Sequence, residues 1–388
     1  MKKIIRISVY ITKIISAKII SLFLKLFLDK YRNVWIISER GYDARDNGYH
    51  FFKYVVEKHC EQPIYFVIDY RSPDYNKIKS IGNCVNYNSF RHFIIFSLAK
   101  VRISTHAWGG DLPVADYYKK LNLQKIYKVP FVFLQHGIIK DFLPMLTYPA
   151  FKTDIFICGA KTEYDYILKN FNHPKGVVQF TGLARYDNLN KSVCKNQILV
   201  MPTFRKWLQR INKTKIQTSD YIKIWNSFLN NKELVSILRS NNLKLVFYPH
   251  YVMQKNIDLF NCSSKEIEIA KFKDYDVQQL LIESKILITD FSSVFFDFAY
   301  MKKPVIYYQF DRDKYINEHY DYTKGYFDYD TMGFGPVSFS EDDLIDCIKN
   351  YIDDNYKVQK KYLELSDKFF ELRDSDNCKR IYKKIKTL

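Results

Sequence analysis

The sequence predicts an α/β protein with two lobes, each built around a parallel β-sheet. Three observations support this fold class. The chain has 388 residues, which is long for one domain and suits two. Beyond residue 30, short apolar runs alternate with amphipathic stretches of helix length, as in right-handed β–α–β units. Hydrophobic residues make up 47% of the chain, with only 12 Gly and 11 Pro, so each lobe can bury a core.

The predicted strands fall into two groups, separated by a polar passage rich in Asn and Lys near residues 187–197. The first group comprises residues 34–38, 64–68, 101–105, 131–134 and 155–158, and the second comprises 198–201, 243–248, 286–289 and 304–308. Helical patterns lie between them, for example at 49–58, 221–230 and 277–283. We therefore predict an amino-terminal lobe over 31–192, a carboxyl-terminal lobe over 193–360, and a final helix within 361–388 that packs back on the amino-terminal lobe.

The first 28 residues form a basic, amphipathic segment without any acidic residue. Its cations are Lys2, Lys3, Arg6, Lys13, Lys18 and Lys25, and at 100° per residue Ile15, Ile19, Leu22, Phe23 and Leu26 gather on the opposite side. The lysines interrupt any span of ~20 apolar residues, and no small-residue cleavage site follows. We predict that residues 1–30 lie as a helix on a membrane surface. A helix packed on its own protein is the alternative.

Charge and cysteine content limit the classes of partner. The chain has 60 Lys plus Arg against 42 Asp plus Glu, and a net charge of +18 favours nucleic acid, anionic lipid or a phosphate-rich substrate. The seven cysteines are scattered without a Cys-x-x-Cys pair, which is typical of reduced thiols. The eight histidines show no metal-ligand spacing. We therefore expect no protein-held metal and no tightly bound cofactor.

The stretch 286–300 predicts a strand, a turn and the start of a helix. Asp290 ends an apolar run, and Ser292 and Ser293 occupy the turn before the next apolar segment. Hydroxyl groups beside the unpaired N–H groups of a helix start suit a phosphate oxygen. A serine that merely caps the helix gives the same pattern.

Two histidines also follow predicted buried strands. His136 precedes Gly137, which permits close backbone approach, and an imidazole there can act as a general base near neutral pH. Lys140 and Asp141 follow, and could orient the ring, hold a phosphate or remain solvated. His250, which follows Pro249, is a candidate charged donor to a phosphate oxygen. For both histidines, a ring satisfied by the fold itself is the alternative.

Three further strand ends carry polar candidates. Thr203 and Arg205 follow the strand at 198–201, where a hydroxyl and a guanidinium can dock a phosphate, although Arg205 in a surface salt bridge is the alternative. Arg40 and Arg45 follow the first strand and are predicted to face the cleft between the lobes. The next helix is expected to be capped by Asp46 or Asn47, and His106 is expected to be structural.

These motifs, in this order, resemble the CDP-glycerol glycerophosphotransferase family of teichoic acid and capsule polyol-phosphate transferases. The resemblance is carried by His-Gly at 136–137, Thr-Gly-Leu-Ala-Arg-Tyr-Asp-Asn at 181–188, Pro-Thr-Phe-Arg at 202–205, His250, the block 276–304 with Thr-Asp-Phe-Ser-Ser-Val-Phe-Phe-Asp at its core, Asp311, 325–328 and 335–337. It covers most of the chain after residue 34. The chain departs from the family at Phe204, where Trp is common, at Phe291, where Tyr is frequent, and at 138–141, where Ile-Ile-Lys-Asp replaces Thr-Pro-Leu-Lys.

The resemblance implies a glycosyltransferase-B-type fold of two Rossmann-like lobes, at the cytoplasmic face of the cell membrane. It implies transfer of glycerol phosphate or ribitol phosphate from a CDP-activated donor to a lipid-linked or growing acceptor, with release of CMP. The roles implied at matching positions are catalytic base for His136, partner of the donor phosphates for His250, and donor-site residues for Thr203, Arg205, Asp290, Ser292 and Ser293. We expect Gly137, Arg40, Arg45, Lys140 and Asp141 to lie on the acceptor side or to support the site.

Two alternatives and one open point accompany this hypothesis. Mg²⁺ could assist the nucleotide without being held by the protein. The same fold could host a glycosyltransferase that uses a nucleotide-sugar. A basic protein that binds membrane or nucleic acid without catalysis is disfavoured, because the cations outside the amino-terminal segment are dispersed and no RNP-like stacking motif is present.

Overall fold

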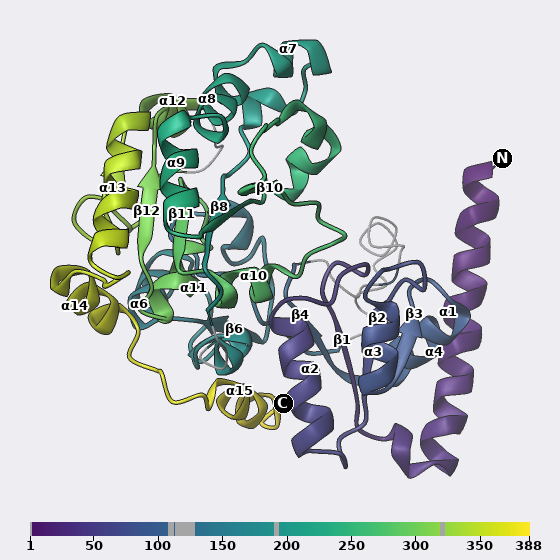
Figure 1. Ribbon diagram of the computed structural model, residues 1–388. Helices are drawn as coiled ribbons and strands as arrows, with labels where there is room; N and C mark the ends of the chain where they lie inside the picture. The colour runs from purple at the N-terminus through teal and green to yellow at the C-terminus, as the bar shows by residue number, and fades with distance from the viewer. Residues whose placement is uncertain (1, 108–111, 113–128, 190–193, 319–322) are drawn as a thin grey trace. The chain divides into compact units, whose positions relative to one another are not determined.

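The computed structural model describes residues 2–107, 112, 129–189, 194–318 and 323–388, which fall into two compact units (Figure 1). Unit 1 contains Met1–His136, Met145–Asp187 and Asp374–Leu388, and unit 2 contains Gly137–Pro144 and Asn188–Arg373. Unit 1 is therefore assembled from three separate stretches of the chain. The candidate base His136 is the last residue of its first stretch.

The described part of unit 1 is built on a parallel sheet of seven strands in the order β3-β2-β1-β4-β5-β6-β7. The strands are β1 (Val34–Ser38), β2 (Ile64–Ile68), β3 (Cys84–Asn86), β4 (Ala99–Ser104), β5 (Phe131–Phe133), β6 (Ile155–Cys158) and β7 (Val178–Phe180). All residues of β1, β2, β5 and β6 are buried, as expected for a parallel sheet covered on both faces. The five strands predicted for this lobe are confirmed.

Helices surround this sheet. They are α1 (Lys2–Phe27), α2 (Asn47–Lys58), α3 (Tyr75–Ile81), α4 (Phe90–Leu98), α6 (Lys161–Asn170) and α15 (Asn377–Ile385), with 3₁₀ turns η1 (Asp29–Tyr31), η3 (Pro144–Leu146) and η4 (Ala184–Asn188). Asp46 caps α2 by accepting a hydrogen bond from the backbone N of Asn47 at 2.7 Å, so the predicted cap is confirmed.

Helix α1 packs against α4 along one side (Figure 1). Ile14 and Ala17 are buried in the same apolar cluster as Phe93, and the ring of Tyr10 stacks on Phe93 with centroids 6.0 Å apart. The other side exposes the apolar residues Ile15, Ile19, Leu22, Phe23 and Leu26, each with 51–69% of its surface accessible. None of the described helices is both long and apolar enough to cross a membrane. One side of α1 is thus part of the core of unit 1, and the other carries an uncovered apolar stripe.

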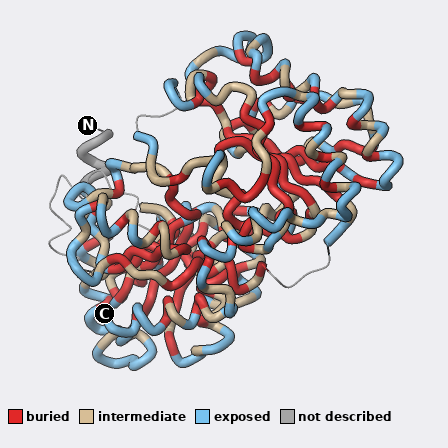
Figure 2. Tube along the Cα trace, turned by 90° about the vertical axis from the view of Figure 1, so that its left-hand side faces the viewer, coloured by how far each residue is buried: buried red, intermediate tan, exposed pale blue. Residues whose placement is uncertain are grey.

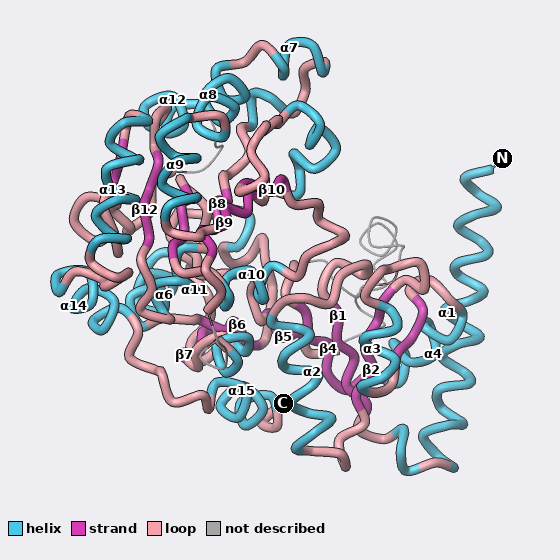
Figure 3. Tube along the Cα trace, in the orientation of Figure 1, coloured by secondary structure: helices cyan, strands magenta, loops and turns pink. Residues whose placement is uncertain are grey.

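The described part of unit 2 holds a parallel sheet of six strands in the order β10-β9-β8-β11-β12-β13 (Figure 3). The strands are β8 (Gln197–Met201), β9 (Lys244–Phe247), β10 (Ile267–Ile269), β11 (Ile286–Thr289), β12 (Val305–Tyr308) and β13 (Val337–Ser338). The four strands predicted for this lobe are β8, β9, β11 and β12, and all are confirmed. In each unit the buried residues concentrate along the strands (Figure 2).

The helices of unit 2 cover its sheet around an aromatic core. They are α7 (Lys213–Gln217), α8 (Asp220–Leu229), α9 (Lys232–Ser240), α10 (Val277–Glu283), α11 (Phe295–Tyr300), α12 (Arg312–Glu318), α13 (Glu341–Asp353) and α14 (Lys360–Phe369), with 3₁₀ segments η5 (Lys206–Leu208) and η6 (Tyr251–Leu259). Trp225 is fully buried, with ring centroids of Phe247 and Tyr308 within 5.5 Å of its own. Such interlocking rings bury much apolar area at fixed geometry.

The final segment of the chain is divided between the units. In α14, Ser366 donates a hydrogen bond to the carbonyl of Ala299 at 2.6 Å, which anchors this helix in unit 2. In α15, the backbone N–H groups of Asn377 and Cys378 both donate to the carboxylate of Asp187 in unit 1. Within the predicted terminal range 361–388, the part from residue 374 onward therefore belongs to unit 1, and the part before it belongs to unit 2.

Candidate functional site

Polar side chains follow neighbouring strands at the carboxyl edge of the unit 1 sheet. His106 lies two residues after β4, and His136 lies three residues after β5. Strands β4 and β5 are paired, with Ser104 opposite Phe133. Ligands of parallel α/β sheets gather at this edge, so the topology brings both histidines to the place where a site is expected.

His136 is an exposed residue whose ring stacks on His106 with centroids 4.8 Å apart and an interplanar angle of 11°. Although the ring keeps accessible surface, the surrounding protein withdraws it from bulk water and so lowers its pKa. Arg40 and Arg185 lower the pKa further, whereas the carboxylate of Asp46 opposes them. The environment therefore favours a neutral imidazole with a lone pair available, which is the form that a general base requires.

The backbone before His136 is held in an unusual conformation. Gln135 has φ +60°, in the left-handed region that residues other than Gly rarely adopt. Its carbonyl accepts a hydrogen bond from Asn47 Nδ2 at 2.8 Å, and its Nε2 donates to Glu163 Oε1 at 3.1 Å and to the carbonyl of Ile157. Strained backbone persists where surrounding contacts over-determine it. These contacts fix the direction in which the chain delivers His136.

Arg185 is a second anchor of the same turn. Its Nη1 donates to the carbonyl of His136 at 2.8 Å and pairs with Asp46 Oδ1 at 2.7 Å, while its backbone N donates to Asn47 Oδ1 at 3.0 Å. Sequence reasoning assigned no role to Arg185, although it lies in the 181–188 motif that carried the family resemblance. Asn47 was considered only as a helix cap.

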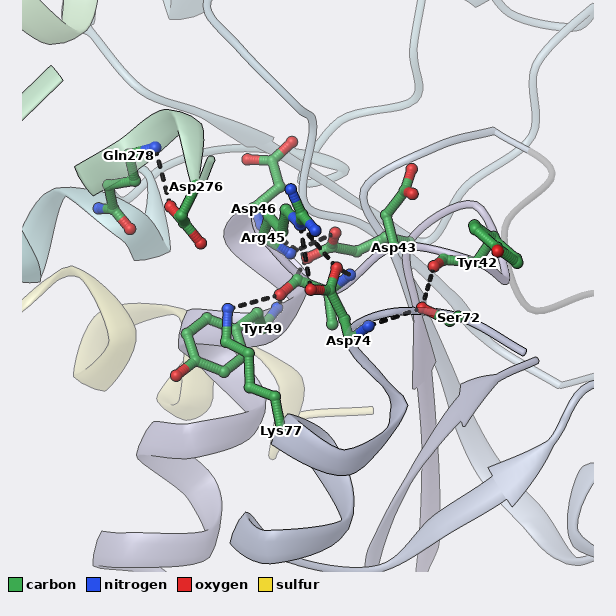
Figure 4. A network of polar contacts seen from close by, with 12 residues as sticks. Tyr42, Asp43, Arg45, Asp46, Tyr49, Ser72, Asp74, Lys77, Asp276 and Gln278 are labelled. Atoms are coloured by element: carbon green, nitrogen blue, oxygen red, sulfur yellow. Dashed lines mark hydrogen bonds and ion pairs between the residues drawn. The ribbon is translucent and has the colours of Figure 1, made fainter. Parts of the chain in front are cut away.

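Arg40 and Arg45, both predicted to face a cleft, have different environments. Arg45 is largely buried, and its Nε donates to both carboxylate oxygens of Asp74, at 3.0 and 2.8 Å (Figure 4). Arg40 keeps 43% of its side chain exposed, pairs with Asp43 at 3.6 Å, and donates from Nε to His106 Nε2 at 3.2 Å. Arg45 therefore supports the loop, and Arg40 is the one of the two arginines that reaches the histidine pair.

The amino terminus of α2 is occupied by a carboxylate of the protein itself. Glu39 is 2% exposed and accepts hydrogen bonds from the backbone N–H groups of Arg45, Asp46 and Tyr49, each at 2.9 Å. Burial raises the pKa of Glu39 to about 7, the charge of Asp46 adds to this, and the three N–H groups oppose it. Because Glu39 already satisfies these N–H groups, this helix start does not serve as a phosphate site.

In unit 2, the serine turn lies between β11 and α11. Ser292 and Ser293 are both partly exposed. Ser292 Oγ accepts from the backbone N of Val294 at 3.5 Å, which is a long contact for a capping hydrogen bond. Helix α11 has only six residues. The turn is therefore placed as predicted, between a strand and a helix, with both serines partly exposed.

Arg205 and Asp290 lie beneath this turn and are fully buried, each with 0% exposed side chain. Arg205 Nη1 pairs with Asp290 at 2.9 Å, and its Nε and Nη2 donate to the two oxygens of Asp311 at 2.7 and 2.8 Å. Asp290 Oδ1 accepts from the backbone N of Thr203 at 2.9 Å. This burial does not fit the prediction that Arg205 and Asp290 contact a phosphate directly. We assign them a positioning role, in which they join the loops after β8 and β11.

Thr203 and His250 retain groups suited to a ligand. Thr203 is 5% exposed, and its Oγ1 has no hydrogen-bond partner among the described residues. His250 Nδ1 accepts from the backbone N of Val252 at 3.3 Å, so the neutral ring carries its proton on Nε2, where it can donate. The ring of Phe204 lies 4.8 Å from that of His250.

Lys140 and Asp141 follow His136 in sequence but belong to unit 2. Lys140 is 9% exposed and pairs with Asp141 at 2.6 Å. The pair lines a cavity of about 150 Å³ in unit 2 with the rings of Phe291 and Tyr315, among others. A Cβ at Gly325 would lie 2.1 Å from the carbonyl of Lys140, so the segment that begins at Gly137 is closely packed. Within unit 2, the charge of Lys140 is balanced by its neighbour.

The two parallel sheets, each with polar side chains at the carboxyl ends of its strands, define a two-unit α/β protein of the glycosyltransferase-B type. The predicted fold class of two Rossmann-like α/β lobes is confirmed, whereas the membrane-binding role of the amino-terminal helix stays a prediction. The chain belongs to the CDP-glycerol:poly(glycerophosphate) glycerophosphotransferase family, whose model matches residues 19–387. The resemblance found in the motifs is thereby confirmed as well.

Relatives of known name agree with this family. The chain is 36% identical over 367 residues to the minor teichoic acid biosynthesis protein GgaB of Bacillus subtilis, covering 91% of this chain but only 39% of GgaB. It is 34% identical over 137 residues to a teichoic acid glycerol-phosphate transferase of Staphylococcus aureus, covering 34% of this chain and 32% of that protein. The chain thus spans about two fifths of GgaB and a third of the transferase.

Solved structures share the fold. The wall teichoic acid polymerase TagF matches with a TM-score of 0.67 and 18% identity, over 97% of this chain and 98% of that one. The UDP-GlcNAc 2-epimerase of Neisseria meningitidis matches with a TM-score of 0.52 and 11% identity, over 92% of this chain and all of that one. At such low sequence identity, both structural matches establish only the fold.

Proposed function

We propose that this protein transfers a polyol phosphate from CDP-glycerol or CDP-ribitol to an acceptor hydroxyl and releases CMP. The observation that carries the proposal is the surface-accessible imidazole of His136, supported by its neighbours in a neutral form, in a chain of this family. Both donors are considered because the relatives include a teichoic acid glycerol-phosphate transferase and the ribitol-phosphate polymerase TarL, both of Staphylococcus aureus.

In the proposed reaction, the acceptor hydroxyl attacks the β-phosphorus of the donor in line with the departing CMP. His136 accepts the proton of the hydroxyl, and the electron pair of the broken P–O bond leaves with CMP. A general base contributes roughly 10²- to 10⁴-fold, less than the 10⁶-fold or more that is typical of enzymes. The remainder must come from groups that stabilise charge on the phosphates.

The donor phosphates are proposed to bind in unit 2. The supporting groups are the hydroxyls of Ser292 and Ser293, the Thr203 hydroxyl that lacks a described partner, and the Nε2–H of His250. Arg205 and Asp290 would hold the two loops that carry these groups. Mg²⁺ is proposed only as a companion of the nucleotide, because the described residues contain no cluster of metal-ligand type.

The test is incubation of the purified protein with CDP-glycerol, CDP-ribitol or a nucleotide-sugar, each with a lipid-linked polyol-phosphate acceptor. We expect CMP release and a product heavier by one or more polyol-phosphate units, measured by mass spectrometry. His136→Gln should lower turnover by at least about 10²-fold while the protein stays folded. Release of UDP or another nucleoside diphosphate from a nucleotide-sugar would instead favour a glycosyltransferase.

We further propose that the protein works at the cytoplasmic face of the membrane through the outer side of α1. Support comes from the exposed stripe of Ile19, Phe23 and Leu26 together with the absence of acidic residues up to residue 28. Replacing these three residues by Gln should abolish sedimentation with vesicles that contain phosphatidylglycerol. Leu168→Gln, which alters an exposed leucine on α6, is the control. Unchanged sedimentation of the triple variant would place the contact elsewhere.

A further inference from the structure

The histidine pair of unit 1 offers an inference beyond the proposed base. His106 was expected to be structural, yet its ring lies 4.8 Å from that of His136 and nearly parallel to it. The two side chains follow paired strands β4 and β5. A flat group packed on one face of an imidazole limits the directions in which the ring can turn. His106 is thus in a position to set the plane of the candidate base.

The hydrogen bonds of His106 determine which tautomer it adopts. Arg40 Nε lies 3.2 Å from His106 Nε2, and a guanidinium can only donate, so Nε2 must be the acceptor. The proton of the neutral ring is then on Nδ1, which lies 2.8 Å from Thr105 Oγ1 and donates to it. The backbone N of His106 also donates to Ser104 Oγ at 3.1 Å. The ring is therefore held at both of its nitrogens, and the backbone of the same residue is held by Ser104.

The charges around the pair also favour a neutral His106. In the loop after β1, Arg40 pairs with Asp43 at 3.6 Å. Asp46, the N-cap of α2, pairs with Arg185 of η4 at 2.7 Å. Protonation of His106 would put an N–H on Nε2, directly facing the N–H of Arg40. Burial, with His136 and Arg40 adding to its effect, lowers the pKa of His106 to about 3.

We propose that His106, held as the Nδ1–H tautomer by Arg40, is a positioning residue that fixes the ring plane of His136. The inference rests on the proposed role of His136 as the base. It assigns His106 and Arg40 to the support of that base, whereas Arg45, five residues further along, pairs with Asp74.

The first test observes the ring without any reaction. Nuclear magnetic resonance of protein labelled with ¹³C and ¹⁵N at histidine should show His106 as the Nδ1–H tautomer, with no titration between pH 5 and pH 8, since its pKa lies at about 3. In Arg40→Gln the tautomer preference should be lost. Titration of His106 near its ordinary pKa, or a wild-type Nε2–H tautomer, would overturn the proposal.

The second test asks whether a flat ring beside His136 is required and sufficient. His106→Phe keeps a planar group beside His136, and His106→Ala removes it. We expect His106→Ala to lower kcat by about 10- to 100-fold with KM for CDP-glycerol or CDP-ribitol changed less than about threefold, and His106→Phe to recover most of that loss. His59→Ala, which removes a ring stacked on Tyr382 at 3.7 Å elsewhere in unit 1, is the matched control and should retain full activity.

The pH dependence of kcat/KM is a further test, because substitution of a purely structural residue would leave it unchanged. Arg40→Gln removes a cation that disfavours imidazolium at His136, so the acid limb of kcat/KM should shift to higher pH. Wild-type kcat in His106→Ala together with an unmoved limb in Arg40→Gln would overturn the inference. If His136→Gln itself retained turnover, the proposed base would fail instead, and the resonance experiment would still decide the tautomer.

Discussion

The strand-end loops of the two units use similar residue types in opposite ways. In unit 1, buried polar groups such as Gln135 and Asn47 hold the backbone so that an imidazole is presented at the surface. In unit 2, Arg205 is itself fully buried and paired with two aspartates. An arginine near a serine turn can thus bind a phosphate or brace the loop, and only its burial distinguishes these roles.

The largest expected effect on stability lies at Arg205. Arg205→Met would leave Asp290 buried without its counter-charge, which should cost about 3–5 kcal/mol of unfolding free energy. Lys213→Met is the control, because the pair of Lys213 with Asp258 is solvent-exposed, with 54% and 58% of the two side chains accessible, and should contribute at most about 1 kcal/mol. Urea denaturation of the full chain checks both. Equal losses would mean that burial does not separate the two ion pairs.

Substitution of Thr203 tests the opposite case to Arg205, a polar group that is available to bind a ligand. Thr203→Val should change the unfolding free energy by less than about 0.5 kcal/mol, because no described partner is lost, yet weaken donor binding by about tenfold or more. Thr289→Val is the mirror control. Its hydroxyl donates to the carbonyl of Met201 at 2.7 Å, so stability should fall while affinity stays. Donor affinity is measured by calorimetric titration with CDP-glycerol and CDP-ribitol. Binding of either donor to Thr203→Val with wild-type affinity would contradict the role of Thr203 in donor binding.

Substitution of Glu39 measures how much its hydrogen bonds stabilise the loop before α2 in unit 1. Both of its carboxylate oxygens accept hydrogen bonds from backbone N–H groups. In Glu39→Gln, the side-chain NH₂ replaces one of these oxygens and must therefore face a backbone N–H, which is also a donor. We expect a loss of about 1–3 kcal/mol in thermal or chemical unfolding. Glu57→Gln, on the exposed surface of α2, should change stability by less than about 1 kcal/mol.

The pH dependence of stability should reveal two unit 1 groups that act with opposite sign. The pKa of His106 is lowered from 6.5 to about 3, so the unfolded chain binds the extra proton and stability should fall as pH drops from 6.5 toward 3. The pKa of Glu39 is raised from 4.5 to about 7, so the folded chain holds the extra proton and stability should fall as pH rises from 4.5 through 7. Unfolding free energies measured against pH should lose the first slope in His106→Phe and the second in Glu39→Gln. Unchanged slopes would show that other groups dominate.

Much of the fold could be predicted because strands buried on both faces are continuous apolar runs. The strands that were missed, β3, β7, β10 and β13, have only two or three residues and each includes a polar one, so no apolar run stands out, unlike in β5. His136 and the serine turn were found because polar residues directly after such runs are conspicuous.

The roles of supporting residues could not be predicted, because their partners are distant in sequence. Arg205 pairs with Asp311, which lies 106 positions away, and Arg185 pairs with Asp46, which lies 139 positions away. Residue type indicated a cation at a strand end in the first case. Only the fold shows that the cation is already neutralised.

The divided sequence of unit 1 has a consequence for synthesis on the ribosome. The carboxylate of Asp187 receives the start of α15 only after residues 374–388 have been made, whereas residues 188–373 of unit 2 are complete before them. Since domains fold as units while the chain emerges, unit 2 can reach its final state first. The half that carries the histidine pair would then be finished last, by the arrival of its terminal helix.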